Sequence, residues 1–235
     1  MGIREDYAPF MDSQGYISDY EGPTLYSSGN LLRYTSEYYI ALKQNGVLTD
    51  EDRAKFRELI AACWCGEPGI LKRYPINKDQ EGPDDYFLVA TAAKVIGTPE
   101  IAQAIYDYGN KHWWNYNNYP DQVPTWKNTS AWFWRMPWLI AHFAFCADKS
   151  PGCFRNLAWS TDVRHVSGSN TDAWALSYSM VLAAPDTDGY KAIKTEWLGN
   201  LHKTFPGGIP EVMSKSFIKG PHPSRLWYGL ETRSA

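Results

Sequence analysis

The chain has 235 residues, 44% of them hydrophobic and 21% charged, a composition typical of a globular protein with one sizeable core. The net charge of -3 and the lack of any run of five Lys or Arg residues argue against nucleic acid as a partner. The longest apolar stretch, residues 139–147, is far too short to cross a bilayer, so we expect no membrane insertion.

The N-terminus does not carry a cationic region followed by an apolar segment, which predicts cytoplasmic synthesis without a signal peptide. We therefore expect the four cysteines to be free thiols. Cys63 and Cys65 fall in a segment with a helical pattern, where side chains two residues apart diverge and cannot form a disulfide.

Residues 1–26 carry glycines, prolines and scattered tyrosines without a sustained period, which predicts an irregular N-terminal arm. Residues 27–235 are expected to form a single helical domain. Apolar residues recur every three or four positions over 31–44, and Asn45-Gly46 ends this helix. Thr49, followed by three acids, predicts the start of a second helix. Its expected buried stripe consists of Phe56, Leu59, Ile60 and Cys63.

The same order of helices returns farther along the chain. Residues 84–96 predict an alanine-rich apolar helix, Gly97 ends it, and residues 101–108 predict an amphipathic one. Further apolar helices are expected over 135–147 and 172–184, the latter followed by amphipathic residues 190–202. Apolar helices must be covered on all sides, whereas amphipathic ones lie at the surface. The alternation therefore predicts an all-α fold of nested helical hairpins with an inner and an outer layer.

This arrangement resembles the α/α toroids of many glycoside hydrolases and polysaccharide lyases, in which all inner helices run the same way. We expect about three or four hairpins from the helical periods, fewer than a complete toroid contains. A partial α/α toroid and a helical bundle with long aromatic loops both stay open. The resemblance implies that the N-termini of the inner helices meet at one mouth, where a ligand would lie.

Three aspartates stand at the predicted starts of inner helices, and they are the candidate catalytic residues: Asp84, Asp85 and Asp172. The resemblance to toroidal glycosidases, among them the unsaturated-uronide hydrolases, implies acid or base catalysis by such a carboxylate. Neighbours on one helix diverge by about 100°, so Asp172 is a better partner for either residue than they are for each other. Each of the three is equally suited to capping its helix.

Residues 112–138 hold six tryptophans, and aromatic faces beside amide groups suit a sugar ring. The candidate substrate-binding residues are Tyr86, Trp113, Trp114, Tyr116, Asn117, Trp126, Trp134, Arg135 and Trp174. Packing of a long loop and a protein interface are the alternatives. Histidine and cysteine spacings match no metal site, and no nucleotide motif occurs, so we expect neither metal nor cofactor. His142, within an apolar helix, is expected to be a hydrogen-bonded core residue.

The chain also resembles uncharacterised proteins of tailed phages, through "EGPDDYFLVATAAKVIG", "WNYNNYP" and "RMPWLIAHFAF". We expect a glycan-recognising helical module, which can be a hydrolase or lyase acting on surface polysaccharide and can be virion-associated. The alternative is a non-catalytic virion structural or assembly protein. Residues 1–30 are acidic and residues 191–235 basic, so contacts between copies of the chain or with virion subunits are also expected.

Overall fold

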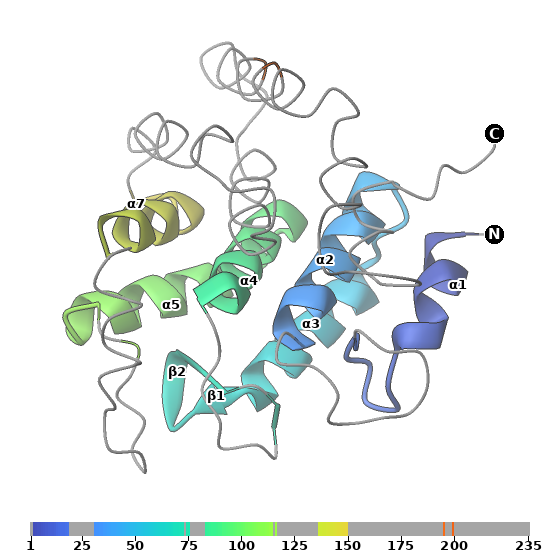
Figure 1. Ribbon diagram of the computed structural model, residues 1–235, viewed down its shortest axis with the longest axis horizontal. Coiled ribbons are helices and arrows are strands. Elements are labelled where there is room, and N and C mark those ends of the chain that lie inside the picture. Colours follow the sequence, from blue (N-terminus) through green and yellow to red (C-terminus); the bar gives the residue numbers. More distant parts are fainter. Residues whose placement is uncertain are drawn as a thin grey trace.

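The computed structural model describes residues 2–18, 31–72, 74–75, 83–114, 116 and 136–149, together with positions 195 and 199. These residues form a mainly helical fold (Figure 1). No helix among them is both long and apolar enough to span a membrane. The predicted helices over 172–184 and 190–202 lie outside the described residues, apart from the two isolated positions.

The first predicted helical hairpin is confirmed. Helix α2 spans Leu31–Gln44, and it is buried from its first residue to Leu42. Helix α3 spans Asp50–Ala62 and begins with a capping box, in which Thr49 accepts from the N–H of Asp52 and the Asp52 carboxylate accepts from the N–H of Thr49. The buried residues of α3 are those of the predicted stripe, Phe56, Leu59 and Ile60, and Cys63 follows at the C-cap.

The second hairpin is also confirmed, with slightly longer helices than predicted. Helix α4 spans Pro83–Ile96, and α5 spans Pro99–Lys111 after a turn at Gly97. Proline suits the first turn of α5 because the N–H it lacks would have no partner there. Helix α7, Met136–Cys146, corresponds to the third predicted apolar helix.

The apolar helices α2, α4 and α7 run in the same direction. The N–H of Arg33, in the first turn of α2, donates to Asp85 in the first turn of α4 (2.8 Å). At the other end, Arg53 of α3 donates to the carbonyl of Ile96, the last residue of α4 (2.8 Å). Lys94 joins the ends of α4 and α7 by donating to the carbonyl of Phe145 (3.2 Å). The starts of α2 and α4 are thus adjacent, and α4 and α7 end together.

Helices α3 and α5 run the opposite way and keep an exposed face, whereas α2 and α4 are buried over most of their length. In the described residues, the apolar helices α2 and α4 are therefore buried and parallel, and the amphipathic helices α3 and α5 are partly exposed, as expected of inner and outer helices. The outer helices return the chain to the inner N-terminal end, defined here as the end where α2 and α4 begin and α3 and α5 finish.

A two-stranded hairpin at the inner N-terminal end was not predicted. Strand β1, Trp64–Cys65, pairs antiparallel with β2, Glu67–Leu71, around Gly66 at φ 82°. The expectation that Cys65 lies in a helix is therefore wrong, because α3 ends at Ala62 and glycine at a positive φ reverses the chain. The described cysteines, Cys63, Cys65 and Cys146, form no disulfide, as expected, and Cys153 lies outside the described residues.

The N-terminal arm is more ordered than its sequence indicated. It contains helix α1, Ile3–Tyr7, the 3-10 turn η1, Ala8–Phe10, and an antiparallel bridge between Met11 and Ile17. Its buried side chains belong to the same hydrophobic core as the helices: Ile3, Tyr7, Phe10, Tyr16 and Ile17. The described part of the arm is therefore integral to the core.

Candidate functional site

Asp85 joins the starts of the two inner helices α2 and α4. Its side chain is fully buried, and its Oδ1 accepts the N–H of Arg33 at 2.8 Å. The first four N–H groups of a helix have no acceptor within that helix, and the helix dipole favours a carboxylate beside them. Asp85 therefore caps α2. Capping of its own helix was the expected alternative to catalysis, and the hydrogen bond described here caps the neighbouring helix.

A buried ion pair lies one turn along α2 from this cap. Arg33 Nε donates to Glu37 Oε1 at 3.1 Å, and the two side chains are 2% and 0% exposed. Buried charges persist only when they are paired and hydrogen-bonded, so the pair and the Asp85 carboxylate make the inner N-terminal end polar inside an otherwise apolar core. Glu37 was not predicted. The sequence feature that could have predicted this ion pair is the four-residue spacing of Arg33 and Glu37, two opposite charges on an apolar helix.

Tyr86 and Tyr116, both predicted to bind substrate, lie in the core. The Tyr86 hydroxyl accepts the N–H of Leu71 at 2.7 Å, which attaches β2 to the first turn of α4. The Tyr116 hydroxyl donates to the carbonyl of Ile105 at 2.5 Å, and its ring contacts that of Tyr86 edge-on, with centroids 4.9 Å apart. Both side chains are fully buried, so their described contacts position other elements.

The remaining predicted residues divide between the end of α5 and the part of the chain whose side chains are not described. Trp113 and Trp114 follow α5 directly. The backbone of Asp84 lies in the first turn of α4. Outside the described side chains are Asp84, Asn117, Trp126, Trp134, Arg135, Asp172 and Trp174. The pairing of Asp172 with Asp84 or Asp85 therefore stays a prediction.

Trp113 holds an unusual position at the C-terminal end of α5. The chain leaves this helix by a left-handed turn, in which Trp113 has φ 55°, Trp114 has φ 59°, and the Trp114 N–H donates to the carbonyl of Gly109 at 2.7 Å. This six-to-one hydrogen bond is the Schellman end, whose left-handed residue is usually glycine. Trp113 occupies that residue's place, and it is 86% exposed.

Two other helices of the chain end in the same way with glycine in the left-handed place. Gly46 follows α2 at φ 68° and Gly97 follows α4 at φ 85°. A left-handed conformation costs an L-residue with a side chain roughly 1–2 kcal/mol relative to its usual conformations. Trp113 carries this strain while its ring stays in solvent, so its exposed indole has no evident role in stabilising the fold.

The ring of Trp114 folds back onto α5 instead. It contacts the Tyr106 ring edge-on, with centroids 5.5 Å apart, and a Cβ at Gly109 would lie 2.5 Å from it. The lack of a side chain at Gly109 thus lets Trp114 lie against the helix. Trp114 therefore packs against α5, whereas Trp113 projects into solvent.

A polar group that was not predicted lies at the same end of α5 as Trp113. Glu67 of β2 accepts from Lys111 Nζ at 2.6 Å and pairs with His112 Nε2 at 2.8 Å. The hydrogen bond from Lys111 lowers the pKa of the Glu67 carboxyl below its usual value. His112 in turn stacks on Tyr108, with ring centroids 4.3 Å apart. No local sequence motif could predict this group, because Glu67 and Lys111 are 44 residues apart in the sequence.

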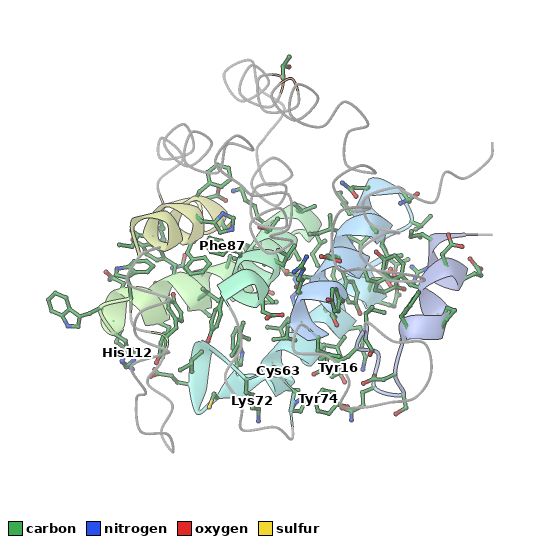
Figure 2. All side chains as sticks on the ribbon, in the orientation of Figure 1. Tyr16, Cys63, Lys72, Tyr74, Phe87 and His112 are labelled. Atoms are coloured by element: carbon green, nitrogen blue, oxygen red, sulfur yellow. The ribbon has the colours of Figure 1, made fainter. Side chains whose placement is uncertain are left out.

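Two of the described cysteines, Cys63 and Cys146, and the second described histidine, His142, are buried in the core. Cys63 Sγ lies 3.4 Å from the Tyr16 hydroxyl (Figure 2), and burial raises the pKa of Cys63 and of Cys146 to about 12. Such thiols stay protonated and are poor nucleophiles at neutral pH. His142 is fully buried, with Nε2 3.2 Å from Thr91 Oγ1, as predicted for a hydrogen-bonded core residue.

The inner N-terminal end thus combines a buried charged cap, an exposed strained tryptophan and a half-exposed carboxylate held by two donors. The exposed indole and the half-exposed carboxylate offer an apolar face and a hydrogen-bonding group at the protein surface. No protein-family model, curated protein or solved structure matches the chain.

Proposed function

We propose that this chain is a glycan-recognising helical protein whose ligand stacks on Trp113 at the C-terminal end of α5. The observation that supports this is an indole 86% exposed to solvent on a backbone conformation that favours glycine. A pyranose ring offers an apolar C–H face to such a plate, while its hydroxyls need hydrogen-bonding groups at the edge. Glu67 and Lys111 provide such groups nearby.

A partial α/α toroid is the architecture that we propose for the helices. The parallel course of α2, α4 and α7, with α3 and α5 running back, supports it. In such a fold the inner N-terminal end is the ligand-binding mouth, and Trp113 and Glu67 lie at that end because α5 and α3 both finish there.

Recognition is better supported than catalysis by Asp85. A general acid or base must come within hydrogen-bonding reach of the reacting atom. Asp85 is fully buried and caps α2, so its described contacts favour a structural role. Hydrolysis or elimination by a pair that includes Asp84 or Asp172 is the activity to assay once a ligand is found.

Binding of oligosaccharides tests the proposal directly. Cellohexaose, chitohexaose, maltohexaose and hexagalacturonate are titrated into the protein while tryptophan fluorescence and melting temperature are recorded. We expect a saturable response to at least one sugar, weakened about tenfold by Trp113→Ala, since loss of one stacking contact costs about 1.4 kcal/mol. Val47→Ala is the matched control, because Val47 is also an exposed apolar side chain, at the far end of α2.

The alternative of a virion assembly protein is an outcome of the same experiment. Light scattering on the same sample reports the oligomeric state. A defined oligomer with no response to any sugar would refute glycan recognition and favour assembly. The described arm residues favour recognition, because Tyr7, Tyr16 and Ile17 are buried against the chain's own helices and are not available to a partner subunit.

A further inference from the structure

Glu67 is a half-exposed carboxylate with a fixed orientation. Its side chain is 39% exposed, Oε2 accepts from Lys111 at 2.6 Å, and Oε1 lies 2.8 Å from His112 Nε2. An ionised carboxylate has about four acceptor positions, so about two remain for a ligand. Lys111 is 63% exposed and uses one of its three N–H donors in this contact.

The strand that carries Glu67 is held tightly against α5. Gly69 lies at φ 100°, where a Cβ would be 2.3 Å from the carbonyl oxygen of Ala104. The Tyr86 hydroxyl binds the N–H of Leu71 at the other end of the strand. The carboxylate therefore stands on a rigid support, and a preorganised polar group loses little entropy when it binds a ligand.

The polar pair and the exposed indole are close along the chain. Lys111 and Trp113 are separated only by His112, and consecutive Cα atoms are about 3.8 Å apart, so their Cα atoms lie within about 8 Å of each other. A ligand of several sugar units can contact both. A ligand of one unit would reach the indole or the carboxylate but need not reach both.

We propose that Glu67 and Lys111 form the polar half of the sugar-binding site whose apolar half is Trp113, and that the site takes a neutral oligosaccharide with vicinal hydroxyls. One hydroxyl donates to the Glu67 carboxylate, and its neighbour accepts from the Lys111 ammonium. A uronate at the same place would bring a second negative charge to Glu67, which disfavours acidic glycans there. This inference rests on the proposed glycan recognition.

Glu67→Gln is the decisive variant, because it removes the charge while keeping the side-chain shape. Titration calorimetry with cellohexaose, chitohexaose, maltohexaose and hexagalacturonate is run on the unaltered protein, Glu67→Gln, Trp113→Ala and Glu58→Gln. Glu58 is the matched control, since it is an exposed acid paired with Lys55 at 2.8 Å on α3. A melting curve for each variant verifies that it is folded.

We expect a neutral hexasaccharide to bind the unaltered protein more tightly than hexagalacturonate does, and Glu67→Gln to weaken it about tenfold, as loss of a hydrogen bond to a charged group does. Glu58→Gln should change the affinity less than about twofold. Unchanged affinity in Glu67→Gln together with loss in Trp113→Ala would overturn the polar half of the site and leave glycan recognition standing. Preference for hexagalacturonate would overturn the neutral ligand. No binding by the unaltered protein would refute the proposed function, and this inference with it.

Discussion

Replacement of Asp85 by alanine should destabilise the chain substantially, because it removes the cap of a helix that Asp85 does not itself belong to. The loss of a helix cap costs about 1 kcal/mol. Because the N–H of Arg33 is buried and would lose its 2.8 Å acceptor, we expect this cost to rise to the upper end for an unsatisfied buried donor, about 3 kcal/mol. A loss of about 3 kcal/mol lowers the melting temperature of a chain of this size by about 6–12 °C.

Thermal and urea unfolding of three variants measures this effect. Asp85→Asn keeps an oxygen that can accept from Arg33, so it should lose about half as much stability as Asp85→Ala. Asp50→Ala is the control, since Asp50 also lies in the first turn of a helix but its side chain is 94% exposed. It should lose less than about 1 kcal/mol. A melting temperature of Asp85→Ala within about 2 °C of the unaltered protein would refute the capping argument. Loss of a sugar-processing activity in such a stable variant would assign catalysis to Asp85.

Three further measurements address other buried contacts. Burial lowers the pKa of His142 to about 3, against about 6.5 in the unfolded chain. Below pH 6.5 the unfolded chain therefore binds a proton that the folded chain does not, so the free energy of unfolding should fall by about 1.4 kcal/mol per pH unit. Urea unfolding at pH 7 and pH 5 should show a smaller loss for His142→Gln, and equal losses would contradict this account. Gly69→Ala should prevent stable folding because the new Cβ would clash with the Ala104 carbonyl. Gly97→Ala, where no atom lies within 4 Å of the added Cβ, should cost only about 1 kcal/mol of stability. Similar melting temperatures for the two variants would count against the tight contact of β2 and α5. Tyr86→Phe removes the acceptor of the Leu71 N–H and should cost about 1–3 kcal/mol in urea unfolding, and no change would show that β2 is held by its packing instead.

Helices α2 and α3 show what local sequence signals can predict. The bounds of α2 follow from apolar residues every three or four positions and from Asn45-Gly46, and the start of α3 follows from Thr49 and the acids after it. These signals act within a few residues, because helical hydrogen bonds and caps join near neighbours. Local signals did not predict the β hairpin, because its strands are short. A glycine such as Gly66 can also occur within a helical pattern, and its positive φ is known only from the structure.

Sequence patterns placed the candidate site residues along the chain but did not determine their surroundings. Asp85 was named from its position at a helix start and Trp113 from its place in a tryptophan-rich segment, and both lie at the inner N-terminal end. Their surroundings could not be predicted: Asp85 turned inward to cap α2, and Trp113 stayed exposed while Trp114 packed. Sequence position places a side chain at an end of a helix, but its burial depends on which other elements pack there.

For the described residues, the sequence by itself determined the helical character, the order of apolar and amphipathic helices, and the caps that begin and end several of them. Only the tertiary structure decided that Glu67 meets Lys111 and that Arg33 donates to Asp85 from 52 residues away. Local periodicity and capping follow from interactions between neighbours along one helix. Contacts between distant residues depend on how whole helices pack, and the same residue pattern is compatible with more than one packing.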